Sequence, residues 1–62
     1  MSELWDVRRT AEWAKSSNEA IYRMVAEGRI PFLRIGRLLR FDPLELEKWA
    51  IRNGGGRDER AS

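Results

Sequence analysis

The stretch RIPFLRIGRLLRF, residues 29–41, constrains the fold most, because its pattern is that of a β-hairpin. Apolar and basic residues alternate along it, as expected for strands that bury one face. Gly36-Arg37 supplies a two-residue turn with glycine at its first central position, which is what a type II′ turn requires. We predict that Arg34 and Arg40 face outward and that Arg37 lies at the tip. The residues predicted to face the core are Leu33, Ile35, Leu39 and Phe41.

Two helical patterns precede the hairpin. The first covers residues 6–15, with Asp6 as the expected N-cap. The second begins at Ser16 or Ser17, which are equally good N-caps, and stops at Gly28, a residue suited to a left-handed C-terminal turn. The predicted buried residues are Val7, Thr10, Ala11, Trp13 and Ala14 in the first helix, and Ala20, Ile21, Met24 and Val25 in the second.

A third helix follows the hairpin. Asp42 is its expected N-cap, Pro43 occupies the first helical position, and Glu45 is placed to complete a capping box. We predict one domain over residues 4–53 and a flexible polar tail over residues 54–62. The residues predicted to be buried in this helix are Leu46, Trp49 and Ala50, and the tryptophans assigned to the core are Trp5, Trp13 and Trp49.

The composition excludes several kinds of chemistry. The 62 residues include no cysteine and no histidine, which removes disulfides, Cys/His zinc sites, thiolate nucleophiles and imidazole bases. The acids are scattered over helix surfaces and caps rather than clustered. We therefore expect no enzymatic activity, no cofactor and no metal site. No apolar run approaches the ~20 residues that span a bilayer, so we expect a cytoplasmic protein without a membrane partner.

The positive charge is concentrated on the predicted hairpin. Residues 28–41 contain four arginines and no acid, whereas residues 42–53 mix both signs. A solvated strand face is one explanation, because outward strand positions are polar in any protein. Lysine, glutamate or threonine would serve solubility equally well, so a run of unopposed arginines indicates an anion-binding surface.

The order helix, tight turn, helix, hairpin, helix gives a fold class that is mostly α with a small β-hairpin. Over residues 5–52 the chain resembles the excisionase-type, MerR-like family of winged helix-turn-helix DNA-binding domains. The most specific motifs are S-x-x-x-x-Y-R from Ser17 to Arg23, G-R-I-P over residues 28–31 and R-I-G-R from Arg34 to Arg37. The chain departs from the family pattern at Leu38, where a polar or basic residue is usual, and at Lys15, where glycine is common.

The resemblance implies that the second helix enters the major groove of DNA and that the hairpin, or wing, reaches the neighbouring minor groove or backbone. Arginine can pair bidentately with guanine and asparagine with adenine. For Glu19 and Arg23 the alternative is a surface ion pair, and Tyr22 contacts a phosphate or covers the edge of the core. The predicted DNA-binding residues are Ser17, Asn18, Glu19, Tyr22, Arg23, Arg34, Arg37 and Arg40.

These features predict a sequence-specific binder of double-stranded DNA, an excisionase-like architectural or regulatory factor of a phage or mobile element. It would act on recombination or transcription, with a recombinase or integrase as a second partner. One alternative is a phage or plasmid transcriptional regulator. Another is a protein-interaction adaptor that reuses the fold and docks onto an acidic partner.

Two aliphatic residues of the third helix fall outside its buried side. Leu44 and Ile51 are seven residues apart and so lie on one line of the helix. One explanation is that Leu44 tucks under the hairpin and that Ile51 is an isolated exposed residue. The other is a protein-contact strip for a neighbouring copy or a recombinase. In that case we expect a monomer in solution that binds cooperatively to adjacent DNA sites.

Overall fold

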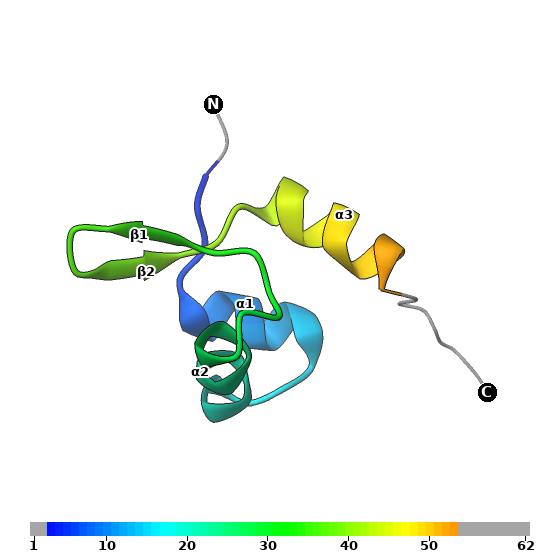
Figure 1. The fold of residues 1–62 in the computed structure, drawn as a ribbon, viewed down its shortest axis with the longest axis horizontal. Coiled ribbons are helices and arrows are strands. Elements are labelled where there is room, and N and C mark those ends of the chain that lie inside the picture. The colour runs from blue at the N-terminus through cyan, green and yellow to red at the C-terminus, as the bar shows by residue number, and fades with distance from the viewer. Residues whose placement is uncertain (1–2, 54–62) are drawn as a thin grey trace.

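The computed structural model describes residues 3–53, which form a small, mostly helical domain with a two-stranded antiparallel hairpin (Figure 1). The predicted tail, residues 54–62, lies outside the described residues. Helices α1 and α2 cross steeply, and the hairpin and α3 extend from them in opposite directions. The elements in chain order are α1 (Val7–Ala14), α2 (Asn18–Ala26), β1 (Leu33–Ile35), β2 (Leu38–Arg40) and α3 (Pro43–Arg52).

Each helix begins at a side chain that caps it. The Asp6 carboxylate accepts a hydrogen bond from the Arg9 backbone N–H at 2.8 Å, and the Asp42 carboxylate accepts one from Leu44 at 3.0 Å. Of the two serine candidates, Ser17 is the N-cap of α2, and its hydroxyl accepts from the Ala20 N–H at 3.1 Å. These bonds satisfy amides that have no partner within the helix. The helix starts predicted from sequence are confirmed to within one residue.

Helices α1 and α2 end in the same backbone motif with different residues. At the end of α1 the Ser16 N–H bonds to the Ala11 carbonyl at 2.9 Å, and Lys15 has φ 54° and ψ 48°. At the end of α2 the Arg29 N–H bonds to the Met24 carbonyl at 2.9 Å, and Gly28 has φ 68°. Both are Schellman motifs, whose left-handed position normally takes glycine. Lys15 is the one non-glycine residue with positive φ between residues 3 and 53.

The core lies where α1, α2, the exit of the hairpin and the first half of α3 meet. Its polar member, Thr10, is fully buried, and its hydroxyl donates to the Asp6 carbonyl at 2.9 Å. Trp5 and Phe41 exchange two backbone hydrogen bonds of 2.8 Å, which tie the start of the chain to the end of β2. The buried apolar residues are Val7, Ala11, Ile21, Ile30, Phe41 and Leu46.

The hairpin forms as predicted, but its two faces differ from the prediction. The register pairs Leu33 with Arg40, Arg34 with Leu39 and Ile35 with Leu38. Directly paired residues lie on the same face of a sheet. Arg34 therefore shares the inward face with Leu39, which packs against the core together with Phe41. The remaining face carries Leu33, Ile35 and Leu38, which are exposed, and Arg40, which is half-buried.

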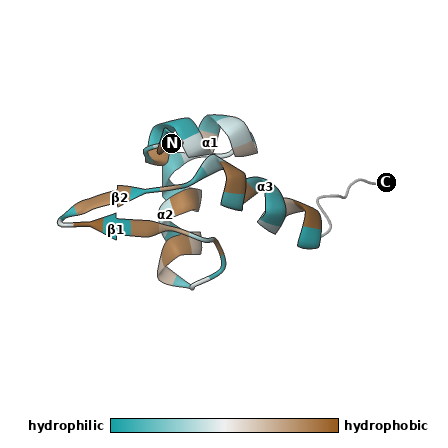
Figure 2. Cartoon of the chain, turned by 90° about the horizontal axis from the view of Figure 1, so that it is seen from above, coloured by the Kyte–Doolittle hydropathy of each residue, from teal (hydrophilic) through white to brown (hydrophobic). Residues whose placement is uncertain are grey.

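The prediction that Leu33 and Ile35 face the core is therefore wrong, as is the prediction that Arg34 and Arg40 share the outward face. A two-residue turn pairs Ile35 with Leu38 and therefore puts these two residues on the same face of the hairpin. Leu39 then lies on the opposite face, so Leu33 and Ile35 cannot share a buried face with Leu39 and Phe41. Gly36 has φ 62° and Arg37 has no positive φ, which agrees with the predicted type II′ turn rather than type I′. Figure 2 shows the resulting apolar stretches along both strands, beyond the reach of the helices.

Trp13, one of the three tryptophans assigned to the core, and Ala14 are exposed instead. Trp13 retains 37% of its surface, and its ring packs against that of Trp5 at 6.2 Å between centroids. The reason is that α1 is covered on one side only, so the edge of its apolar stripe stays open. Trp5 and Trp49 are half-buried and pack against the core. Within residues 3–53 no helix has the length and apolar character that crossing a membrane requires.

Candidate nucleic-acid interface

A groove of about 620 Å³ runs between the start of α1, one side of α2 and the hairpin. It joins elements that are far apart in sequence, because the Trp5–Phe41 bridge holds the first turn of α1 beside the end of β2. Charged and polar side chains line it from all three sides, over a floor that includes Val7, Val25 and Leu39. The charged and polar lining residues are Asp6, Arg8, Asn18, Tyr22, Arg34, Arg37 and Arg40.

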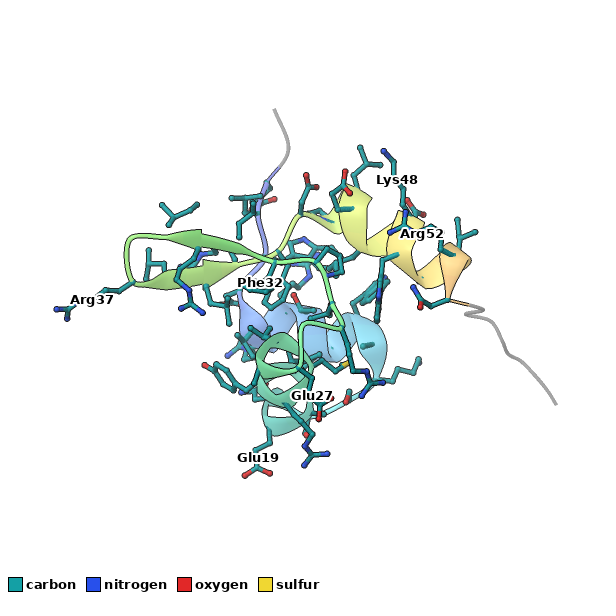
Figure 3. All side chains as sticks on the ribbon, in the orientation of Figure 1. Glu19, Glu27, Phe32, Arg37, Lys48 and Arg52 are labelled. Atoms are coloured by element: carbon teal, nitrogen blue, oxygen red, sulfur yellow. The ribbon has the colours of Figure 1, made fainter. Side chains whose placement is uncertain are left out.

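The hairpin arginines approach this groove from different directions. Arg34 projects from the inward face, with its guanidinium 5.9 Å from the centre of the Phe32 ring. Arg37 lies at the tip and points away from the body of the domain (Figure 3). Arg40 lies on the outward face, where its Nη1 donates to the Leu39 carbonyl at 2.8 Å. The hairpin therefore presents positive charge on both faces and at its end.

These guanidiniums have no carboxylate partner within residues 3–53. The ion pairs in this part of the chain are Arg29–Glu27 at 3.0 Å and Lys48–Glu45 at 3.8 Å. Arg29, the first arginine of the basic run, is thus paired with Glu27, the C-cap residue of α2. Asp6 is the carboxylate that lines the groove, and it is bound to the first turn of α1. Four arginines and one aspartate line the groove, and this excess of positive charge favours an anionic ligand.

Helix α2 contributes two side chains to the groove and leaves others beside it. Asn18 and Tyr22 are one turn apart and face the hairpin, and Tyr22 is more than half exposed. Glu19 and Arg23 lie on the next strip of the helix, outside the groove lining, and Figure 3 shows Glu19 directed away from the hairpin. The Glu19–Arg23 ion pair, the alternative explanation for these two residues, is not among the ion pairs formed within residues 3–53. Ser17 is committed to capping α2.

Arg8 joins the interface although the sequence pattern did not single it out. On α1 alone it falls on the polar side, as any solvated residue does. The fold places the first turn of α1 against the hairpin, and Arg8 then faces the same groove as Arg34 and Arg40. No local sequence signal could have found it, because its neighbours in the groove come from residues 34–40. The other exposed arginine of this turn, Arg9, stacks over Trp5 at 4.9 Å.

The chemistry of this surface is that of a binding site. Guanidiniums supply bidentate donors for phosphate oxygens, an amide can pair with a base edge, and a phenol can donate to phosphate. Residues 3–53 contain no cluster of three or more acidic, histidine or cysteine side chains that could hold a metal ion. The groove therefore suits an anionic ligand.

The predicted protein-contact strip lies on α3, at the other end of the molecule from the hairpin tip. Leu44 and Ile51 are 53% and 76% exposed, so Leu44 does not tuck under the hairpin. Lys48 flanks them and forms its ion pair with Glu45. Figure 3 places Lys48 and Arg52 on this helix, far from Arg37.

No protein-family model matches this chain, and neither the curated proteins nor the solved structures give a significant match. The assignment of the interface therefore rests on its own geometry and charge.

Proposed function

We propose that this chain is a winged helix-turn-helix domain that binds double-stranded DNA, with α2 in the major groove and the hairpin as the wing. The single observation that carries this proposal is the groove. It brings polar side chains of α2 together with the hairpin guanidiniums, none of which has a carboxylate partner in residues 3–53. Separate explanations for each residue do not account for their convergence on one surface.

The dimensions of the elements support this assignment. An α-helix with its side chains is about 10–12 Å in diameter, so α2 fits the major groove, which is about 12 Å wide. Asn18 and Tyr22 face the protein's own groove between α2 and the hairpin, and Arg23 lies on the adjacent exposed strip of α2. One helix therefore offers donors for bases and for phosphates. Arg34, Arg37 and Arg40 then contact the backbone on either side. Phosphate contacts orient the protein, and contacts to base edges specify the sequence.

We further propose that the domain acts as an excisionase-like architectural or regulatory factor, which changes how a recombinase or a polymerase assembles on DNA. A small domain with a basic groove suits this role, because it can occupy adjacent sites on DNA without chemistry of its own. The resemblance in sequence motifs supports the same assignment. Transcriptional regulation of a phage or plasmid operon is the neighbouring role for the same interface.

The test is the salt dependence of binding to duplex DNA, measured by fluorescence anisotropy for the parent protein, Arg37→Ala and Arg52→Ala. Both variants lose one arginine, but Arg52 lies on α3 away from the groove. We expect Arg37→Ala to lower the slope of log affinity against log salt by about 1, the loss of one phosphate contact. We expect Arg52→Ala to bind like the parent. Binding that does not depend on salt, or an equal effect of both substitutions, contradicts the proposal and favours the adaptor.

A further inference from the structure

The outward face of the hairpin carries three aliphatic side chains that are about half exposed and do not pack against the core formed within residues 3–53. Leu33, Ile35 and Leu38 are 44%, 51% and 53% exposed. Ile35 and Leu38 are directly paired and flank the Gly36-Arg37 turn, so they form an apolar pair at the very end of the hairpin. Figure 2 shows this end extending beyond the helices. DNA binding through phosphates alone gives no reason for such a pair.

The charge around this pair indicates what covers it. Arg37 lies at the tip, Arg40 lies on the same face, and Arg34 lies on the opposite face. No acid occurs on the hairpin, and none of these arginines has an ion-pair partner in residues 3–53. A protein that covered the aliphatic pair would also have to neutralise these guanidiniums. The minor groove of DNA meets both needs, because phosphates line its edges, sugars form its walls and base acceptors form its floor.

The hairpin is too wide for an undistorted minor groove. Its two strands lie about 4.8 Å apart before side chains are counted, whereas the minor groove is only about 6 Å wide. The Ile35–Leu38 pair cannot enter without opening the groove. Proteins that insert apolar side chains there partly unstack a base step and kink the duplex. Pyrimidine–purine steps deform most easily, and A-tracts resist deformation.

We propose that Ile35 and Leu38 form an apolar wedge with which the hairpin opens the minor groove and bends the bound DNA. The wedge makes the protein sensitive to DNA flexibility, so that it selects pyrimidine–purine steps through their deformability rather than through base contacts. This inference rests on the proposed function and adds a role for residues that the phosphate contacts leave unused.

The experiment uses two 24-base-pair duplexes labelled at both ends for energy transfer, one with alternating TA steps and one A-tract. The full chain is compared with Ile35→Thr/Leu38→Thr, which removes apolar surface but keeps strand-forming residues. The matched control is Leu33→Thr, on the same face but paired with Arg40 away from the turn. Circular dichroism verifies that each variant is folded. A Leu38→Phe variant, in which the side chain is larger but still apolar, tests whether apolar character at this position is sufficient.

We expect the parent to bind the TA duplex at least threefold more tightly than the A-tract and to raise the energy transfer. The double threonine variant should bind both duplexes equally and leave the energy transfer unchanged, whereas Leu33→Thr and Leu38→Phe behave like the parent. Equal bending by the parent and the double variant, or no bending by the parent, overturns the wedge and leaves the proposed function standing. Absence of salt-dependent binding by the parent overturns both.

Discussion

At the scale of single residues, Lys15 and Gly28 occupy the same position in two copies of one helix-ending motif. The left-handed conformation brings a β-carbon close to the following carbonyl oxygen, which costs an ordinary residue about 1–2 kcal/mol. Gly28 avoids this cost, and Lys15 does not. Lys15 is tolerated because the Ser16–Ala11 hydrogen bond and the short link to α2 require the turn at this point.

Replacing Lys15 with glycine should therefore stabilise the domain. We expect Lys15→Gly to raise the free energy of unfolding by up to about 1 kcal/mol, since relief of the left-handed strain exceeds the added flexibility of the unfolded chain. The reciprocal variant Gly28→Ala should lower it by about 1 kcal/mol. A β-carbon at Gly28 has no heavy atom within 4 Å, so the cost comes from the backbone alone. Urea denaturation followed by tryptophan fluorescence measures both, and a destabilised Lys15→Gly would show that the lysine side chain has a role of its own.

At the scale of elements, α2 and the hairpin divide the work of DNA recognition in the proposed complex. Helix α2 presents an amide and a guanidinium, which can distinguish bases, and a phenol, which can donate to a phosphate. The hairpin presents arginines in different directions, which suits phosphates along a backbone. The same residue type is thus assigned different tasks according to the element that carries it.

This division predicts different behaviour for two arginines. We expect Arg23→Ala to weaken binding to a selected site by about 1–3 kcal/mol while leaving random duplex nearly unaffected. Arg37→Ala should weaken both substrates to a similar extent, because phosphates are present in every sequence. Titrations on a site obtained by selection from random duplexes, and on scrambled DNA, provide the comparison. If the ratio of affinity for the selected site to affinity for scrambled DNA were the same in both variants, this division between α2 and the hairpin would be refuted.

Helix α3 is attached to the domain by one face, which a pair of leucines on the same helix can test. Leu46 is fully buried in the core, whereas Leu44 is about half exposed. We expect Leu46→Ala to lower the free energy of unfolding by about 2–5 kcal/mol, a large share of the stability of so small a domain. Leu44→Ala should change it by no more than about 0.5 kcal/mol. Thermal and urea denaturation measure both, and similar effects would place α3 in a different rotation about its axis.

At the scale of the whole molecule, the basic groove and the exposed aliphatic residues of α3 lie on different parts of the surface. DNA bound in the groove leaves Leu44 and Ile51 accessible. Two aliphatic side chains bury far less than the ~1,000 Å² that a stable interface needs, so we expect the free protein to be a monomer. On adjacent DNA sites, a high effective concentration makes a weak contact effective.

We therefore expect Leu44→Gln/Ile51→Gln to bind a single site like the parent and to lose the additional affinity for two abutting sites. The expected loss is about 1–2 kcal/mol, the size of a modest coupling between bound molecules. Anisotropy titrations on one-site and two-site duplexes give the ratio of the two affinities. Sedimentation of the free protein tests whether it is a monomer. An unchanged ratio excludes the strip as a contact between copies and leaves a recombinase as its remaining candidate partner.

The sequence by itself determined the elements and their ends. Asp6, Asp42, Gly28 and the Gly36-Arg37 turn act through bonds to residues a few positions away, so each carries its signal locally. The expectation that Ile21 and Leu46 are buried also follows from local helical periodicity. Tertiary contacts were not needed to foresee any of these.

Which faces meet was decided by the tertiary structure. The two-residue turn places Leu33 and Leu39 on opposite faces of the hairpin, but nothing in the hairpin itself says which face is buried. The Trp5–Phe41 bridge settles this, because it fixes the face of Leu39 and Phe41 against the helices. The same bridge brings Arg8 into the groove with Arg34. Contacts between residues more than twenty-five positions apart depend on how complete elements pack, and local sequence patterns do not encode that packing.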